Sequence, residues 1–344
     1  MAANLTTASG GLSGQYQKYF DKSLLTSVLQ LLVMDQFAQI KNLPADGGAL
    51  TVRFTRPDTP VRSNVQSLSE GVALSTDRGY TYSFVDATCT QVGEKSTVSD
   101  ILGATNLFDT LQNLSKVLGQ EAAHYYDFSI TQEIVPNVLA ANKIYSGGAA
   151  NYAALAALFG STGKIAIVDI LRAFTRLMLA RAPKAGATNS RTTTVKGGDY
   201  VAIMPPQVAF DLMQDTKFTD AGVRGNNDGL FTGELGTWYG ARIIRGTQPW
   251  IEKATENTYD GTIVYDVGGA TGSIFSTIVT GSEQFGVVNL ASQAISSPKL
   301  IVCDKPDKSD QLNQITSVGW KAFFVVKTLK SDWAAIIRSK VSYS

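Results

Sequence analysis

Apolar residues recur at two different spacings along the chain, and the spacing separates predicted helices from predicted strands. Between residues 105 and 135 they recur every three or four positions, which predicts an amphipathic helix. At 1.5 Å per residue this helix is roughly 45 Å long, more than the diameter of many small domains. A second helix is predicted over residues 165–182. The inward-facing residues expected on the two helices are Leu107, Leu111, Leu114, Leu118, Tyr125 and Phe128, then Ile167, Ile170, Leu171, Phe174, Leu177 and Met178.

A stretch of alternating apolar and polar residues predicts a long β-hairpin. Its strands are residues 50–56 and 80–92, and the polar segment 57–79 between them forms an exposed tip. Alternation puts Tyr80, Tyr82 and Phe84 on one face of the second strand, with Val85, Ala87 and Cys89 on the other. Because an isolated hairpin is barely stable in water, we expect this one to depend on a partner. The three aromatic residues are therefore candidates for a contact between subunits.

The rest of the chain mixes short helices with many strands. Residues 16–40 have a partly helical pattern, and the strand 200–204 leads through two prolines into a short helix. Further strands are predicted at residues 241–245, 262–267, 273–280, 285–290, 299–304, 315–330 and 333–343. One dominant helix with much antiparallel sheet gives the fold class α+β.

Charge is scarce and unevenly distributed. Charged residues are 17% of the 344, whereas a typical soluble domain has about 25%, which indicates a surface that partners cover. The totals, 30 Lys+Arg and 29 Asp+Glu, argue against a protein whose main task is to grip nucleic acid. Residues 164–198 nevertheless hold seven basic residues and one acid, and residues 199–270 hold five basic residues and ten acids. Opposed patches of this kind favour a contact between copies.

The basic segment supplies three further candidates for that contact. Arg172, Arg176 and Arg181 lie on or directly after the second predicted helix. We expect them to meet either the acidic segment of a neighbouring copy or packaged DNA. The alternative is a solvated helix face with no partner.

The sequence offers little for catalysis or metal binding. It has one histidine, His124, and two cysteines far apart, so it lacks the clustered ligands of a zinc site and a disulfide framework. Gly160-Ser-Thr-Gly-Lys164 resembles a phosphate-binding loop, but Leu158 and Ile165 occupy positions that such a loop needs for glycine and for Ser or Thr. We interpret it as a helix start with Ser161 or Thr162 as N-cap. No enzyme activity, cofactor or membrane span is expected.

Several short motifs follow one another in an order that is informative. They are YFDKSLL at 19–25, Asp35-Gln-Phe37 followed by Leu43-Pro44 and Gly47-Gly48, Leu68-Ser-Glu70-Gly71, Gly233-Glu-Leu-Gly236 before Tyr239-Gly-Ala-Arg-Ile-Ile244, and Val318-Gly-Trp-Lys321. In this order the chain resembles the major capsid protein of a tailed bacteriophage, with the Hong-Kong-ninety-seven-type fold. It resembles most the family of the N-four-type short-tailed phages.

This resemblance implies a division of the chain into parts. Residues 1–48 correspond to an N-terminal arm, 49–98 to the extended loop that overlies a neighbour, and 99–198 to a peripheral domain with a spine helix. Residues 199–300 correspond mainly to an axial domain, and 301–344 to strands that return to the peripheral domain. Glu70, within the extended loop, is a further subunit-contact candidate.

The implied function is structural. The chain is expected to assemble into hexamers and pentamers of an icosahedral shell around double-stranded DNA, in the cytoplasm of a bacterial host. Implied partners are the portal protein, a separate scaffolding protein, possible decoration or cement proteins, and DNA bound without sequence preference. The scaffolding protein is expected to be separate because about a hundred residues, a domain-sized insert, do not fit before the arm.

Another structural role is the alternative. A tail tube protein or another virion or surface-layer subunit would also be poor in charge and rich in sheet. The long helix beside a hairpin argues against it, because tube and layer proteins are commonly almost all β. An enzyme with an unrecognised site is a third possibility.

Overall fold

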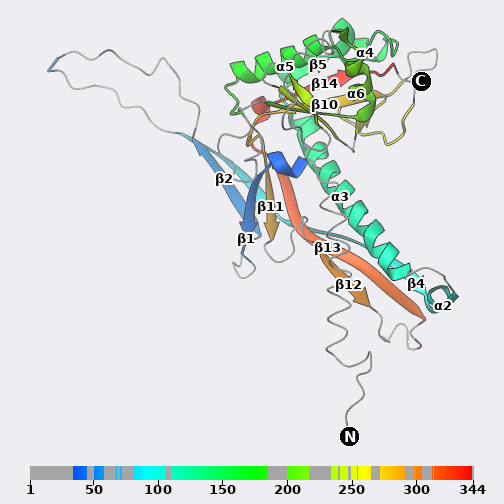
Figure 1. Ribbon diagram of the computed structural model, residues 1–344. Helices are drawn as coiled ribbons and strands as arrows, with labels where there is room; N and C mark the ends of the chain where they lie inside the picture. Colours follow the sequence, from blue (N-terminus) through cyan, green and yellow to red (C-terminus); the bar gives the residue numbers. More distant parts are fainter. Residues whose placement is uncertain are drawn as a thin grey trace.

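The computed structural model has an elongated lower part and a broader upper part, joined by one long helix (Figure 1). It describes residues 34–44, 50–57, 67, 70–71, 81–105, 110–184, 200–216, 234–238, 241–246, 249–253, 255–264, 272–290, 298–303, 312 and 314–342. Helices and strands are mixed throughout, so the α+β prediction is confirmed.

The lower part is built on a five-stranded sheet. Its strands are β1 (Gln39–Leu43), β4 (Thr90–Ser99), β11 (Phe285–Leu290), β12 (Lys299–Cys303) and β13 (Ile315–Thr328). The 14-residue β13 is the central strand and pairs antiparallel with β4, β11 and β12, whereas β1 joins β11 in parallel. Its even-numbered residues from Val318 to Val326 are buried and its odd-numbered residues are partly exposed. One face of this sheet therefore carries the core.

The long helix α3 (Thr110–Asn137) covers that face. Its 28 residues correspond to roughly 42 Å. The predicted helix is confirmed, but a separate short helix, α2 (Asp100–Thr105), precedes it, and α3 continues one residue past Pro136. Residues 106–109, which were expected in its first turn, lie outside the described residues.

One residue that was predicted on the inward face of this helix lies on its exposed face. Tyr125 is exposed and the next residue, Tyr126, is fully buried, with its ring 5.5 Å from that of Phe324. The buried stripe passes through Ala122, Tyr126 and Ile130, because small residues let the helix lie close to the sheet. The predicted stripe was drawn through the large apolar residues alone, so it was rotated around the helix axis from the stripe that is buried.

The upper part is built on a seven-stranded sheet with helices on both faces. The strands are β5 (Lys143–Tyr145), β6 (Tyr200–Met204), β7 (Glu234–Trp238), β8 (Ala241–Arg245), β9 (Trp250–Glu252), β10 (Ile274–Thr280) and β14 (Ala334–Ser339). Alternate residues of β6 and β14 contribute to two separate cores. One core includes α3, and the other includes α5 (Ile167–Leu179) and α6 (Pro206–Met213).

Helix α5 agrees with its predicted face over most of its length. Ile167, Ile170, Phe174 and Leu177 are buried, but Met178 is exposed. Its N-cap is Ala166, so the predicted caps Ser161 and Thr162 are wrong. The helix instead starts with backbone groups held by carboxylates: the Ala166 and Ile167 N–H groups donate to Asp169 and Asp215.

Short elements complete the described structure. They are the 3-10 helices η1 (Met34–Phe37), η3 (Ala140–Asn142), η4 (Ser146–Gly148) and η5 (Ser331–Trp333), the helix α4 (Tyr152–Ala156), and the two-stranded sheet of β2 (Thr51–Pro57) with β3 (Tyr82–Thr88). The predicted strand 80–92 therefore divides at Cys89, and Gln39–Ile40 begin a strand instead of ending a helix. Within the predicted strand 262–267, the described residues 262–264 are not in a strand.

A buried ionic network crosslinks the upper part. Arg338 on β14 and Glu252 on β9 are fully buried and form a two-pronged ion pair, with N–O distances of 2.9 and 3.1 Å. Arg338 also contacts Glu256, at 3.0 Å, and Asn257, at 2.8 Å. Charged groups buried in this way are stable only with such partners, so the network fixes the segment after β9 to the sheet.

Both cysteines are free thiols, Cys89 buried and Cys303 exposed. Among the described residues, the helices are too short or too polar to cross a membrane.

Candidate intersubunit surfaces

The β2–β3 hairpin has one face turned toward its own subunit and one toward solvent. Its register runs from Thr51 opposite Thr88 to Pro57 opposite Tyr82. Tyr82 and Phe84 are 54% and 57% exposed, whereas Ala87 is buried and Val85 is half-buried. The predicted division of the strand into two faces is thus correct. Tyr80, the third aromatic candidate, lies outside the described residues.

The inner face fixes the base of the hairpin to the five-stranded sheet. Phe54 of β2 is buried in a small core with Ala87, Cys89 and Val288. Its ring lies so close to Gly286 of β11 that a Cβ there would be 2.7 Å from a ring carbon. The absence of a side chain at Gly286 is therefore what lets the hairpin dock at this point.

Charges at the hairpin are paired within the subunit. Arg53 donates two hydrogen bonds, of 2.7 and 2.8 Å, to Asp86 on the opposite strand, and these bonds hold the pKa of that carboxyl below its usual value. The Arg56 guanidinium lies 4.1 Å from the ring centre of Trp333 and 3.5 Å from the Glu283 carboxylate. Burial lowers the pKa of Arg56. The charge on the outer face is thus locally compensated beside two exposed aromatic rings.

The three basic candidates on and after α5 have different roles. Arg172 has a side chain that is 55% exposed and pairs at 3.1 Å with Asp169. Arg176 is half-buried and donates a hydrogen bond to the backbone oxygen of Lys143, so it works inside its own subunit. Arg181 is exposed directly after the helix. The contact expected from the sequence stays a prediction, with Arg172 and Arg181 as its exposed members.

The acidic segment that was expected to face this stripe is partly used inside the chain. Glu252 is fully buried against Arg338, and Glu256 contacts both Arg338 and Lys143. Asp211 is buried and accepts hydrogen bonds from the backbone and hydroxyl of Ser342. The count of acids in the sequence thus overestimates what this region can present to a neighbour. Glu70, the candidate in the predicted extended loop, is exposed.

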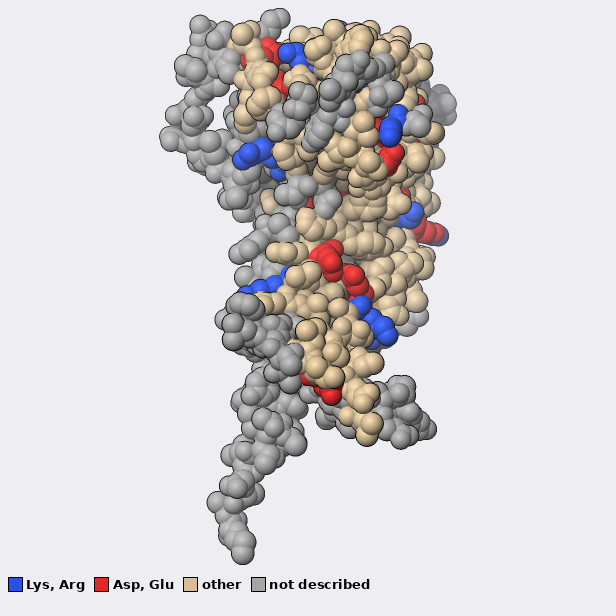
Figure 2. Space-filling model, turned by 90° about the vertical axis from the view of Figure 1, so that its right-hand side faces the viewer, with Lys and Arg blue, Asp and Glu red and all other residues tan. Residues whose placement is uncertain are grey.

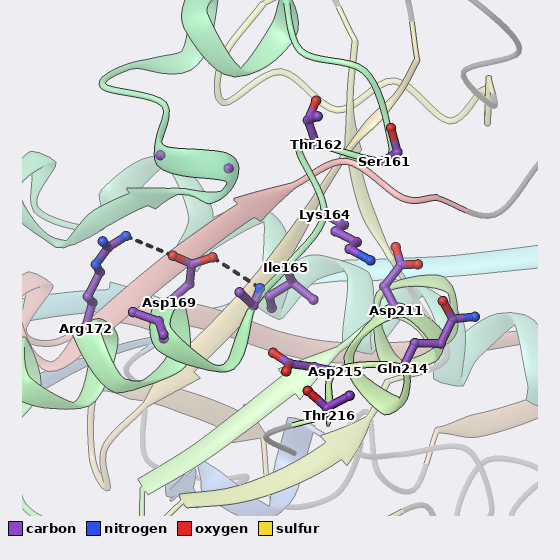
Figure 3. Close-up of a pocket in the computed structure, with 14 residues that line it drawn as sticks. Ser161, Thr162, Lys164, Ile165, Asp169, Arg172, Asp211, Gln214, Asp215 and Thr216 are labelled. Carbon is purple, nitrogen blue, oxygen red and sulfur yellow. Dashed lines mark hydrogen bonds and ion pairs between the residues drawn. The ribbon is translucent and has the colours of Figure 1, made fainter. Parts of the chain in front are cut away.

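A cavity of about 520 Å³ lies where α5 begins, beside the end of α6 (Figure 3). The Ser161–Lys164 turn, which resembles a phosphate-binding loop, lines this cavity. Asp169, Asp211 and Asp215 line it together with Lys164 and Arg172. Burial raises the pKa of the Asp169 carboxyl. Three carboxylates would repel a phosphate, so the geometry agrees with the interpretation that this turn is not a nucleotide site.

Among the described residues, His, Cys, Asp and Glu do not cluster in groups of three that could hold a metal ion. On the face shown in Figure 2, most of the described surface is uncharged, with small separate groups of acidic and basic side chains. Exposed apolar surface and local charge pairs are therefore the features that a partner would recognise.

Comparison with known proteins identifies the fold of the chain. Neither protein-family models nor curated protein sequences match the chain. Solved structures do match it. The capsid of Ralstonia phage GP4 is 13% identical over 91% of this chain and 92% of the other, with a TM-score of 0.64. The capsid of cyanophage Pam1 is 12% identical over 90% and 93%, with a TM-score of 0.60.

A structure other than a phage capsid also matches. The SrpI encapsulin complex of Synechococcus elongatus PCC 7942 is 10% identical over 90% of this chain and 86% of the other, with a TM-score of 0.52. At such identities a match establishes fold alone, and the narrower resemblance to N-four-type phages stays a prediction. The chain has the fold of bacteriophage major capsid proteins, the Hong-Kong-ninety-seven-type fold.

Proposed function

We propose that the chain is the major structural subunit of an icosahedral phage capsid, forming hexamers and pentamers around double-stranded DNA. The observation that carries this proposal is the hairpin. Its base is buried in its own subunit, while Tyr82 and Phe84 expose their rings beside a compensated charge pair. Exposed aromatic side chains of this kind are typical of a surface that a partner covers.

Each part of the fold is assigned the role that the resemblance to capsid proteins implies for it. We assign the hairpin to the extended loop that overlies a neighbour, α3 to the spine of the peripheral domain, and most of the seven-stranded sheet to the axial domain. We assign residues 90–98 to the peripheral domain, because β4 pairs with β13 over ten residues, and we propose an extended loop shorter than residues 49–98. The arm of residues 1–48 is a proposal that rests mainly on residues outside the described structure.

Assembly, on this proposal, needs no chemistry beyond contacts that tolerate small changes of angle. A portal protein, a separate scaffolding protein, a decoration protein and packaged DNA remain proposed partners. Arg172 and Arg181 are the described candidates for the predicted contact with a neighbour or with DNA. Assembly would take place in the cytoplasm of the bacterial host.

A cargo-holding shell is the second candidate, because an encapsulin shares the fold at a TM-score above 0.5. Both candidates require a closed shell and differ in its contents. The tail tube and surface-layer alternatives have no comparable support from the described architecture, in which a 28-residue helix backs a sheet. Recovering nucleic acid or protein from purified particles distinguishes the first two candidates.

Electron microscopy of the purified chain tests the proposal directly, with closed shells as the expected result. The hairpin is tested by Tyr82→Ser with Phe84→Ser, which should leave the monomer folded and reduce the yield of shells at least tenfold. Ser83→Ala is the matched control, because Ser83 lies between the two rings and its hydroxyl contacts the Arg56 backbone oxygen instead. Normal shells from the double variant would show that the aromatic face is not a contact.

A further inference from the structure

The ionic network of the upper part holds an amine beside a side-chain amide. The Lys143 Nζ lies 3.2 Å from the Asn257 Oδ1 and 3.4 Å from the Glu256 carboxylate. Arg338 donates a second hydrogen bond, of 2.8 Å, to the same amide oxygen. These side chains come from β5, from the segment after β9 and from β14, so only the fold brings them together. An amine, an amide and a carboxylate in mutual contact are the groups that an isopeptide bond requires.

The backbone holds the amine and the amide in place. Asn257 has a φ of 61°, a left-handed conformation that asparagine tolerates better than most residues, and its N–H donates to the buried Glu252 carboxylate at 3.1 Å. Lys143 is opposite Ile336 in the ladder between β5 and β14, and its backbone oxygen accepts a hydrogen bond from Arg176. The Lys143 side chain is only 12% exposed. The two groups therefore meet where little water surrounds the amine.

The contact brings the amine close to the carbon that it would attack. The Asn257 Cγ is one C=O bond, about 1.23 Å, from the amide oxygen, so the Lys143 nitrogen lies within about 4.5 Å of this carbon. Groups held so close react as if they were present at very high concentration. The Arg338 guanidinium already donates to the oxygen on which negative charge develops during the attack, as a donor of an oxyanion hole does.

We propose that Lys143 and Asn257 form an isopeptide bond within one subunit. The Glu256 carboxylate takes a proton from the Lys143 ammonium, and the neutral amine then attacks the Asn257 Cγ. The Nζ–Cγ bond forms and the Cγ–Nδ2 bond breaks, while Glu256 passes its proton to the departing nitrogen and takes a second proton from Nζ. This second proton leaves with the ammonia, so an ammonium and an amide become an isopeptide and an ammonium ion. The reaction consumes no other reactant.

The charge state of Glu256 sets the pace of this reaction. Burial opposes its ionisation, but Arg338, Tyr145 and Lys143 hold the pKa of the carboxyl below its ordinary value of 4.5. At neutral pH the carboxyl is therefore ionised and can accept a proton, but it is a weak base. The bond should accumulate slowly after folding. Once formed, it closes a loop between positions 114 residues apart, and so restricts the unfolded chain as a disulfide does.

Mass spectrometry of the full chain tests the inference. After refolding and incubation at neutral pH, the chain should be lighter by one ammonia than the chain kept in denaturant. Digestion should release a branched peptide that joins Lys143 to Asn257. Lys143→Arg keeps the positive charge and removes the nucleophile, so both signals should disappear. Lys330→Arg is the matched control, because Lys330 pairs with Asp332 at 3.7 Å and both signals should remain.

A second variant tests the proton transfer. In Glu256→Gln the side chain keeps its size and can accept hydrogen bonds, but it cannot take a proton. The branched peptide should therefore accumulate at least about tenfold more slowly, with the circular dichroism unchanged. A refolded wild-type chain that keeps its mass and releases no branched peptide would overturn the inference. A loss of ammonia that persists in Lys143→Arg would also overturn it, because an asparagine would then be cyclising on its own backbone. Neither result bears on whether the chain forms shells.

Discussion

The two sheets of this molecule differ in how their faces are covered. In the seven-stranded sheet, all the residues of β6, β10 and β14 are buried, because α3 covers one face and α5 with α6 covers the other. In the five-stranded sheet, the central strand β13 alternates between buried and partly exposed residues, with α3 on its buried face. These three strands are thus covered on both faces within the subunit, whereas the second sheet leaves one face partly exposed.

This difference indicates which surfaces of the molecule are open to partners. The hairpin with Tyr82 and Phe84 is attached to the half-covered part of the molecule. A subunit with one fully covered sheet and one half-covered sheet should gain stability on assembly mainly at the half-covered sheet. Substitutions in the covered sheet should therefore affect folding, and substitutions on the exposed side of the half-covered one should affect assembly more than folding.

The largest effect is expected in the seven-stranded sheet, from Glu252→Ala. This change leaves the Arg338 guanidinium buried without its main partner, which typically costs about 3–5 kcal/mol of unfolding free energy. Removing both charges, with Glu252→Leu and Arg338→Met, should cost less than the single change, because no unpaired charge is buried. Denaturant unfolding followed by circular dichroism measures both.

The control for that experiment is the exposed ion pair on the hairpin. Asp86→Ala removes the partner of Arg53 at a site where water solvates both groups, so the unfolding midpoint should hardly change. If Glu252→Ala were as mild as Asp86→Ala, the buried network would not be what stabilises the seven-stranded unit.

A smaller effect on folding is expected from Gly286→Ala at the base of the hairpin. The added Cβ would lie 2.7 Å from a ring carbon of Phe54, and such overpacking costs about 1–3 kcal/mol when neighbours must move. We expect faster hydrogen exchange of the amides in β2 and β3, with the seven-stranded sheet unchanged. Assembly should suffer, because the aromatic face is no longer held at a fixed angle.

Two variants sharpen this result. Gly261→Ala is the control, since its Cβ would meet Tyr259 at an ordinary distance of 3.5 Å. Phe54→Leu added to Gly286→Ala should restore part of the protection by making room. Unchanged exchange in the hairpin of Gly286→Ala would mean that Phe54 can shift freely and does not anchor it.

How far the sequence predicts this structure depends on what each residue packs against. The faces of α5 and of the hairpin strand around Val85 follow from periodicity, because each packs on one neighbouring surface of the same chain. The face of α3 was misjudged at Tyr125, since close packing there depends on the small residues Ala122 and Ala123. Periodicity weighs large residues and cannot tell which small ones bring a helix close.

The candidate surfaces were predictable to a similar, limited extent. Exposure of Tyr82 and Phe84 follows from strand alternation, and the fold agrees with the resemblance. The hydrogen bond from Arg176 to the Lys143 backbone oxygen could not be predicted, because it depends on tertiary structure.

The smallest expected effect concerns a pair of carboxyl groups between the half-covered sheet and its helix. Partial burial, and then the nearby carboxylate of Glu94 on β4, raise the pKa of Glu121 on α3 above its ordinary value of 4.5. A raised pKa in the folded state contributes stability that is fully present below that ordinary value. This contribution is lost as the pH rises through the folded pKa.

Glu121→Gln should therefore leave stability unchanged near pH 4 and raise it slightly at pH 7, by less than about 0.5 kcal/mol because both groups are largely solvated. Unfolding midpoints of wild type and variant at several pH values measure the difference. Glu70→Gln, at an exposed carboxyl elsewhere, is the control. A variant that is less stable than wild type at pH 7 would mean that the ionised Glu121 has a favourable partner. The half-covered sheet would then be better supported in the free subunit than the comparison of the two sheets implies.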